Sequence, residues 1–289
     1  MTTAQAVVDS HIHFWDTDRF DYPWLQGFSG LNRPFVPADL DVGEVQIEAL
    51  IFVQANPVWD VVDQETAWVQ DLREGDRRIQ ALVAGVPLDR GAAAVHAPLE
   101  RLSHEPGVAG VRQLIQDEPE GFSVQAPFVE AVRLAGQFGL TVDLCVRNHQ
   151  IAEVTKLAER CPEVTFVLDH LGKPDVAAGQ WTAWLHDIKA MARLDNVRCK
   201  LSGLTTEADE GTRGTNDIRR YLRAAVDAFG PERCMFGSDW PNASLQISYA
   251  GWVSLVLDSV SDLADLERDR VMRGTALEVY ARAWEAAEP

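Results

Sequence analysis

The chain has 289 residues, of which 46% are hydrophobic and 24% are charged. This composition is typical of a globular protein that buries a large core, and it argues against intrinsic disorder. The 44 acidic and 26 basic residues give a formal net charge of -18 at pH 7. Such a charge repels polyanions, so we expect neither nucleic acid nor an anionic membrane surface as a partner. The net charge does not exclude a small-molecule substrate, because a pocket can carry its own local charge.

The start of the chain lacks the basic segment and apolar run of a signal peptide. No stretch reaches the roughly 20 apolar residues that span a bilayer. We therefore expect a cytoplasmic protein, and assembly into a homo-oligomer stays open. Cys145, Cys161, Cys199 and Cys234 are widely spaced without a C-x-x-C pair, and we interpret them as reduced core residues.

Eight short segments rich in Val, Ile, Leu and Phe predict buried strands. In chain order they cover residues 6–13, 48–56, 79–88, 107–115, 140–147, 164–172, 196–204 and 234–241. Helical periodicity fills several of the intervals, over 61–75, 128–139 and 218–230, and each of these helices is expected to stop at its final glycine. This alternation predicts parallel strands joined by right-handed crossovers.

The simplest arrangement of eight such units is a (β/α)8 TIM barrel, and we predict one α/β domain over residues 1–289. An open doubly wound sheet is the alternative, but no Gly-rich phosphate loop follows a predicted strand. The segment from Thr17 to Asp41 is long and rich in aromatic residues. We expect it to cover the barrel mouth and to shape a pocket there.

Polar side chains gather where the predicted strands end. His11 and His13 end the first strand, His170 ends the sixth and Asp239 ends the eighth. The other polar residues near strand ends are Arg112 and Gln116 late in the fourth, His149 just after the fifth, and Lys200 and Ser202 late in the seventh. All C-terminal strand ends of a TIM barrel face one rim, so we expect these residues to converge on an active site there. Residues i and i+2 of a strand share a face, which directs both His11 and His13 toward the same basin.

Imidazoles together with a carboxylate are ligands that zinc takes at an open catalytic site. We predict one divalent cation, with zinc as the expected ion, on His11, His13, His170 and Asp239. A single H-x-H is a weak signal, and two partly solvated imidazoles near the N-terminus are the alternative. His170 and Asp239 strengthen the metal hypothesis because an unpaired carboxylate in an apolar strand end would be costly.

Further residues near the strand ends are candidate substrate contacts. A guanidinium such as that of Arg112 can bind a carboxylate or sugar hydroxyls, or it can pair with a neighbouring acid. Aromatic side chains beside the motifs can pack on a sugar-derived ring. The alternative for His149 is an exposed loop residue without a contact to substrate. The alternative for Lys173 and Glu207 is a charge on the solvated surface. The predicted substrate-binding residues are Gln54, Arg112, His149, Lys173, Glu207, Trp15, Trp24 and Trp240.

Six motifs, taken in order, resemble a known family: VDSHIHFWD, DYPWL, GVRQLIQDEPEGF, LDHLGKPDV, CKLSGLTTEAD and MFGSDWP. The set is similar to the amidohydrolase superfamily, in particular to the amidohydrolase-2 branch of sugar-lactone hydrolases of the L-fuconolactonase and L-rhamnonolactonase type. The resemblance covers nearly the whole chain. It implies a (β/α)8 barrel that hydrolyses a lactone ester, with His11, His13, His170 and Asp239 at metal or catalytic positions.

The chain also departs from the superfamily pattern. Arg112 and Gln113 stand where the superfamily has a metal-bridging lysine or glutamate, so we expect one ion rather than two. His149 corresponds only loosely to the strand-five histidine. Some members of this branch work without a metal, so a metal-independent lactonase is an alternative. In the predicted reaction Asp239 takes a proton from water and returns it to the leaving alkoxide, and His170 is the second catalytic residue.

The same residue types leave other functions open. The resemblance also admits a nonoxidative decarboxylase of an aromatic or unsaturated acid and a muconolactone-type lactonase. From a different class, the barrel could be a binding or scaffold protein without catalysis. DYPWL, GKP and CKLSGL favour the sugar lactone, whereas the sugar acid and the lactone ring size stay open.

Overall fold

The computed structural model describes residues 6–208 and 212–285. Its centre is a parallel eight-stranded sheet in which β1 to β8 follow one another in chain order. The ring is nearly closed, because the Asp239 amide donates to the His11 carbonyl over 2.8 Å in the segment that follows the last strand. This confirms the predicted (β/α)8 barrel. The strands are β1 Ala6–Ile12, β2 Gln46–Val53, β3 Ile79–Gly85, β4 Val108–Leu114, β5 Thr141–Cys145, β6 Phe166–Leu168, β7 Val197–Leu201 and β8 Cys234–Phe236.

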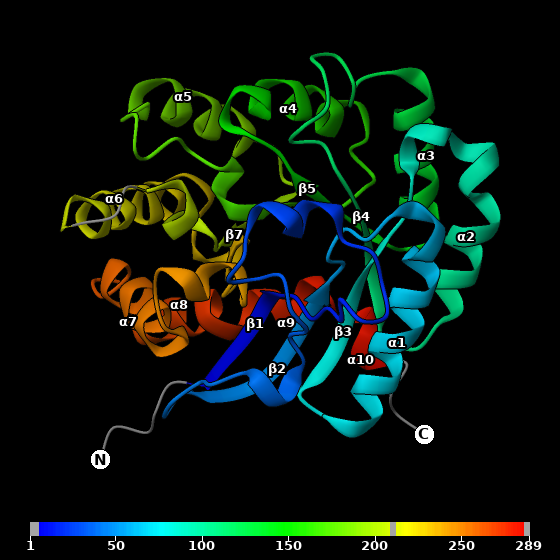
Figure 1. Ribbon diagram of the computed structural model, residues 1–289. Helices are drawn as coiled ribbons and strands as arrows, with labels where there is room; N and C mark the ends of the chain where they lie inside the picture. Colours follow the sequence, from blue (N-terminus) through cyan, green and yellow to red (C-terminus); the bar gives the residue numbers. More distant parts are fainter. Residues whose placement is uncertain (1–5, 209–211, 286–289) are drawn as a thin grey trace.

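Helices surround the strands in chain order (Figure 1). The predicted helices 61–75, 128–139 and 218–230 correspond to α1, α3 and α6. Within the described residues, no helix has the length and apolar character needed to cross a membrane. The helices are α1 Val62–Gly75, α2 Ala92–His104, α3 Ala126–Gln137, α4 Ile151–Arg160, α5 Trp181–Met191, α6 Thr212–Phe229, α7 Tyr249–Ser259, α8 Asp265–Asp269, α9 Thr275–Val279 and α10 Arg282–Glu285.

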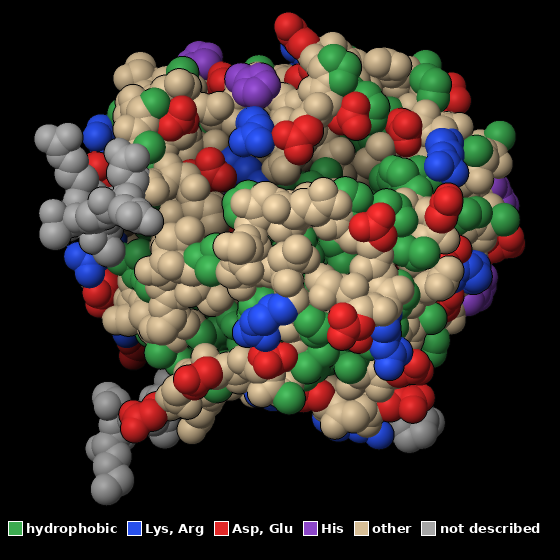
Figure 2. All heavy atoms as spheres, in the orientation of Figure 1, with side chains coloured by type: hydrophobic (Ala, Val, Ile, Leu, Met, Phe, Trp, Pro, Cys, Tyr) green, Lys and Arg blue, Asp and Glu red, His purple; other side chains and the backbone are tan. Residues whose placement is uncertain are grey.

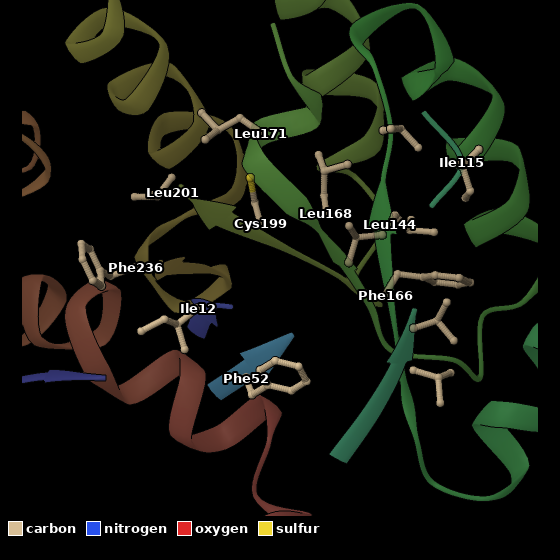
Figure 3. Close-up of a cluster of buried hydrophobic side chains, with 14 of the residues drawn as sticks. Ile12, Phe52, Ile115, Leu144, Phe166, Leu168, Leu171, Cys199, Leu201 and Phe236 are labelled. Atoms are coloured by element: carbon tan, nitrogen blue, oxygen red, sulfur yellow. The ribbon is translucent and has the colours of Figure 1, made fainter. Parts of the chain in front are cut away.

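Successive strand residues enter two different buried layers. In β2, Leu50 and Phe52 join the large core between strands and helices, whereas Ala49, Ile51 and Val53 join a second cluster inside the barrel. Figure 3 shows part of the large core, with labelled side chains from β1, β2, β5, β6, β7 and β8. Burial on both faces explains why these strands are continuous apolar runs in the sequence. Each fully buried Leu or Phe contributes roughly 1.5–3 kcal/mol.

The C-terminal helices close the barrel at the end opposite the strand C-termini. Ala276, Tyr280 and Ala283 pack into the interior cluster with residues from the early part of the strands, such as Val8 and Ala49. The four predicted core cysteines are buried and free of disulfides. Figure 2 shows acidic and basic side chains interspersed over the face drawn, with no patch of a single sign.

The aromatic segment after β1 lies in front of the strands in Figure 1. It is fixed to the barrel by specific hydrogen bonds: the Trp24 indole N–H donates to the Ala55 carbonyl over 2.9 Å, and the Tyr22 hydroxyl donates to Glu65 of α1 over 3.0 Å. Glu65 is fully buried and also accepts from the Ala55 amide. The segment therefore docks as an ordered cover rather than a free loop.

Candidate active site

A cavity of about 510 Å³ lies at the C-terminal ends of the strands. The aromatic segment supplies one apolar side through Trp24, Phe28 and Leu31, as the sequence predicts for a cover over the mouth. His13, Arg112, His170 and Asp239 also line the cavity, together with polar residues from the loops after β4 to β8. The lining is thus amphipathic, with an apolar side that faces charged and amide groups.

His11 lies near the end of β1 and His13 directly follows the strand, and both are buried. Their Nε2 atoms are 3.1 Å apart and the rings are nearly perpendicular, so both side chains point into the same basin as the i, i+2 spacing predicts. His13 Nδ1 lies 2.7 Å from the Val53 carbonyl oxygen, which can only accept a hydrogen bond. The ring proton is therefore on Nδ1, and the His13 Nε2 lone pair points to His11.

His170 does not end a long strand, as the sequence pattern suggested. β6 stops at Leu168, and His170 belongs to the turn η6 (Asp169–Gly172), where its φ of 54° is left-handed. Leu171 has φ 55° and Lys173 has φ 47°, so the turn keeps this unusual conformation over several residues. Strained backbone of this kind is found mostly where a site demands it. The turn directs the His170 ring toward His11, with ring centroids 4.4 Å apart.

Asp239 likewise lies beyond its strand, because β8 ends at Phe236 and the chain turns sharply with φ 56° at Asp239. Its Oδ1 atom is 3.4 Å from His13 Nε2 and accepts from the Asn242 amide over 3.1 Å. Burial alone would raise the pKa of Asp239, but the neighbouring histidines, His170 foremost, hold it below its usual range. The carboxylate is thus ionised at neutral pH.

Burial has the opposite effect on the histidines. It lowers the pKa of His11 well below its usual value despite the attraction of Asp169, and it lowers the pKa of His170 to about 4. Both rings are therefore neutral at neutral pH. Neutral imidazoles and an ionised carboxylate are the states that metal binding requires, and an ionised carboxylate is also what proton abstraction requires.

Behind His11 lies a buried group of charged side chains. Asp169 Oδ1 is 3.1 Å from His11 Nδ1, and Asp169 Oδ2 accepts from Arg112 Nη1 over 3.0 Å. Lys200 Nζ is 3.1 Å from Asp169 Oδ1 and 2.5 Å from Asp143 Oδ2. Asp143, Asp169 and Lys200 are at most 1% exposed. Buried charges persist only when they are paired, and here each is paired.

The geometry of the ligand atoms fits one divalent cation. One ligand atom from each of His11, His170 and Asp239 lies within 4.8 Å of the others, and His13 Nε2 is 3.1 Å from His11 Nε2. Ligand atoms on a tetrahedral zinc at its usual bond lengths lie about 3.3–3.5 Å apart. The two imidazoles are positioned for this, and the carboxylate completes a suitable donor set. His11, His13, His170 and Asp239 would hold such an ion.

Of the predicted substrate contacts, Trp24, Arg112, Lys173 and Glu207 line the cavity. Lys173 Nζ donates to Gln116 Oε1 over 2.5 Å, which fixes its ammonium at the cavity wall. Arg112 forms the ion pair that the sequence left as its alternative, yet its buried Nε has no hydrogen-bond partner among the described residues.

The other predicted contacts lie outside the cavity lining of the described chain. His149 is exposed on η5 (Asn148–Gln150), the loop position that was its alternative. Trp15 is fully buried, and its indole N–H donates to backbone carbonyls of the aromatic segment. Trp240 packs edge-on against aromatic rings, and Gln54 is 1% exposed and accepts from the next loop. Packing of the cover, rather than ligand contact, accounts for the two tryptophans.

Sequence reasoning missed several residues of the site. Asn56 and Asn242 line the cavity from loops, where no periodic pattern marks them, whereas Gln116, expected at the rim, does line it. Lys200 was also expected at the rim, but the structure buries it inside the barrel. Asp143 carried a usable signal, because it is a charge inside an otherwise apolar strand segment, TVDLC. A charge in such a strand needs a buried partner, and the barrel supplies it from the neighbouring strands.

Comparisons with known proteins agree with this site. A sequence profile of the amidohydrolase family matches residues 8–282. An L-fucono-1,5-lactonase from Burkholderia multivorans is 36% identical, with 95% of each chain aligned. An L-fucono-1,5-lactonase from Burkholderia ambifaria is 30% identical, with 94% of each chain aligned. A crystal structure of an amidohydrolase from Burkholderia multivorans with bound zinc has a TM-score of 0.83 and 34% identity, covering 96% of this chain and 99% of that chain.

The profile match, the barrel and the histidines and aspartate gathered at its mouth confirm the resemblance seen in the sequence motifs. The chain belongs to the amidohydrolase family and is a hydrolase.

Proposed function

We propose that the protein hydrolyses the lactone of a sugar acid, an aldonolactone of the L-fucono or L-rhamnono kind, to the open-chain acid. One observation carries the proposal: the ionised Asp239 carboxylate lines the cavity 3.4 Å from His13 Nε2, in a group suited to activate water. The L-fucono-1,5-lactonase relatives support the substrate class. The amphipathic lining suits a ring that has hydroxyl groups as well as an apolar face.

Asp239 acts as the general base and then as the general acid. It accepts a proton from the attacking water while the water oxygen forms a bond to the lactone carbonyl carbon. When the ring C–O bond breaks, the same proton passes to the leaving alkoxide, which becomes the free hydroxyl of the product. Asn242 Nδ2 donates to Asp239 Oδ1 over 3.1 Å and holds the carboxylate in one orientation.

Negative charge that develops on the carbonyl oxygen needs donors or a cation nearby. A zinc ion, when bound to His11, His13, His170 and Asp239, supplies Lewis acidity at this position. Arg112 lines the cavity, and its buried Nε–H has no hydrogen-bond partner among the described residues. Lys173 and Glu207 can bind hydroxyl groups at the wall, and Trp24 can pack on the apolar side of the ring.

The decisive assay is proton release with a panel of aldono-1,4- and 1,5-lactones. We expect hydrolysis by the wild type and a loss of at least about 1,000-fold in kcat for Asp239→Asn, which removes the proton acceptor and keeps the shape. Asp258→Asn on α7 serves as the matched control, since its side chain is exposed, pairs with Arg219 and is not part of the cavity lining. Normal turnover by Asp239→Asn would refute the role of this carboxylate.

The rival functions give distinct results in the same experiment. Carbon dioxide release from aromatic or unsaturated acids, without lactone hydrolysis, would identify a decarboxylase. Turnover of muconolactone-type acids alone would move the substrate class away from sugars. Full turnover after chelation, with no zinc in the protein, would establish a metal-independent lactonase that relies on Arg112 and Asp239.

A further inference from the structure

The barrel interior holds a column of polar groups of which the proposed reaction uses only the first, His11. It begins at His11 below the cavity and continues through Asp169, Lys200 and Asp143 to the Tyr280 hydroxyl, which is 3.3 Å from Asp143 Oδ2. Every member is fully or almost fully buried. Buried charge is not needed to fill a TIM barrel, whose interior is usually packed with branched apolar residues.

Lys200 is the centre of this column. An ammonium group has three N–H donors, and Lys200 Nζ has three acceptors in reach: Asp143 Oδ2 at 2.5 Å, Asp169 Oδ1 at 3.1 Å and His11 Nδ1 at 3.2 Å. His11 Nδ1 has a second neighbour, Asp169 Oδ1, at 3.1 Å. The same ring nitrogen therefore faces a cationic donor and an anionic acceptor at nearly equal distances.

Two hydrogen-bond arrangements follow without any change in the charge of the ring. In the first, His11 Nδ1–H donates to Asp169, Lys200 keeps only its two carboxylate acceptors, and the lone pair on Nε2 faces the cavity beside the lone pair of His13 Nε2. Two lone pairs 3.1 Å apart repel each other, and the nearby Arg112 Nη1, 3.4 Å from His11 Nε2, already donates to Asp169 Oδ2, so this arrangement gains most from a cation between the two rings. In the second, Lys200 donates to His11 Nδ1, and His11 Nε2–H donates to His13 Nε2.

We propose that Lys200 is a positioning residue that selects the tautomer of His11, so that the ring keeps its proton on Nε2 until a divalent cation binds. Without the ion, the Lys200 donor holds the proton of His11 on Nε2. With the ion, the proton moves to Nδ1 and is accepted by Asp169, and His11 Nε2 becomes a ligand. Asp143 keeps Lys200 in place in both arrangements, and Tyr280 in turn bonds to Asp143.

The proposal rests on the metal-ligand role of His11 in the proposed function, but it does not depend on the substrate. Histidine side-chain ¹H–¹⁵N correlation spectra distinguish a protonated from an unprotonated ring nitrogen, and His11→Gln assigns the signals. In metal-free wild type we expect the His11 proton on Nε2, and after zinc addition we expect it on Nδ1. A His11 proton on Nδ1 in the metal-free wild type would overturn the proposal.

The double variant Lys200→Met with Asp143→Asn tests the cause. It removes the Lys200 donor together with its partner charge, so the buried pair is replaced rather than broken. We expect the metal-free His11 proton on Nδ1 and zinc binding about tenfold tighter, the usual size of an outer-shell effect on metal affinity. Lys189→Met, at an exposed position on α5, is the matched control and should change neither readout.

An unchanged His11 tautomer together with unchanged zinc affinity in the double variant would show that Lys200 has only a structural role. Zinc titration and the spectra need no substrate. Failure of lactone hydrolysis would therefore refute the proposed function and leave this test intact.

Discussion

Gly203→Ala is the most direct test of how tightly the site is built. Gly203 follows β7 and has φ 66°, a left-handed conformation. A methyl group there would lie 2.4 Å from His170 Nδ1 and 3.0 Å from Asp239 Oδ2. Real Cβ atoms do not come as close as 2.4 Å to another atom, so the His170 ring or the backbone at Gly203 must move, and the 3.0 Å contact presses on Asp239 as well. The backbone at Gly203 is thus part of the site although its residue has no side chain.

The expected magnitude has two parts. An alanine in the left-handed region costs roughly 1–2 kcal/mol of stability. Displacement of the His170 ring also breaks its 2.9 Å hydrogen bond with Ser202, which is worth about 1 kcal/mol. We therefore expect a loss of about 2–3 kcal/mol in the free energy of unfolding. A shift of about 1 Å in a catalytic group lowers turnover about 100-fold.

The assays are urea denaturation and proton release with the best lactone. Gly179→Ala is the matched control, because Gly179 also has φ 66° but has no atom within 4 Å of the added methyl group. We expect it to lose about 1–2 kcal/mol of stability and to keep its activity. The reasoning is refuted if the two variants have equal kcat.

Three further predictions concern other parts of the site. Burial raises the pKa of Glu65 from 4.5 to about 8, so its stabilising contribution is complete below pH 4.5 and is lost as the pH rises through 8. The loss is on the order of 5 kcal/mol at most, and urea denaturation across this range should show it in wild type but not in Glu65→Gln. His13→Ala should reduce bound zinc below one ion per chain by elemental analysis, while His149→Ala should not; equal zinc in both would contradict the ligand role. Ser202→Ala removes the hydrogen bond to His170 and should lower kcat about tenfold with a stability loss of about 1 kcal/mol, and an unchanged kcat would show that this bond does not orient the ring.

The strand pattern predicted the barrel well because it reflects burial. A segment such as EALIFVQAN is apolar at every position, and this is required when one face packs on helices and the other fills the barrel interior. The convergence of His11, His13, His170 and Asp239 followed from the same inference, since strand ends of a closed parallel barrel share one rim. The Thr17–Asp41 cover was predictable from its aromatic content and length.

The prediction was less accurate where the backbone leaves regular geometry. β6 and β8 were expected to continue to His170 and Asp239, yet both residues have positive φ in turns beyond the strands. No single-sequence pattern identifies a left-handed histidine or aspartate, because the conformation is unfavourable locally and is maintained only by surrounding contacts. The same limit applies to Trp15, whose burial under the cover depends on how that segment docks.

The sequence by itself determined the alternation of strands and helices, the barrel and the histidines and aspartate that gather at its mouth, because these depend on periodicity and on strand polarity. Only the tertiary structure decided which polar groups meet across the barrel. Lys200, Asp169 and Asp143 come from three strand regions, and their hydrogen bonds with His11 depend on distances of about 3 Å that no spacing in the sequence specifies. The orientation and protonation of the His11 ring are therefore properties of the closed barrel.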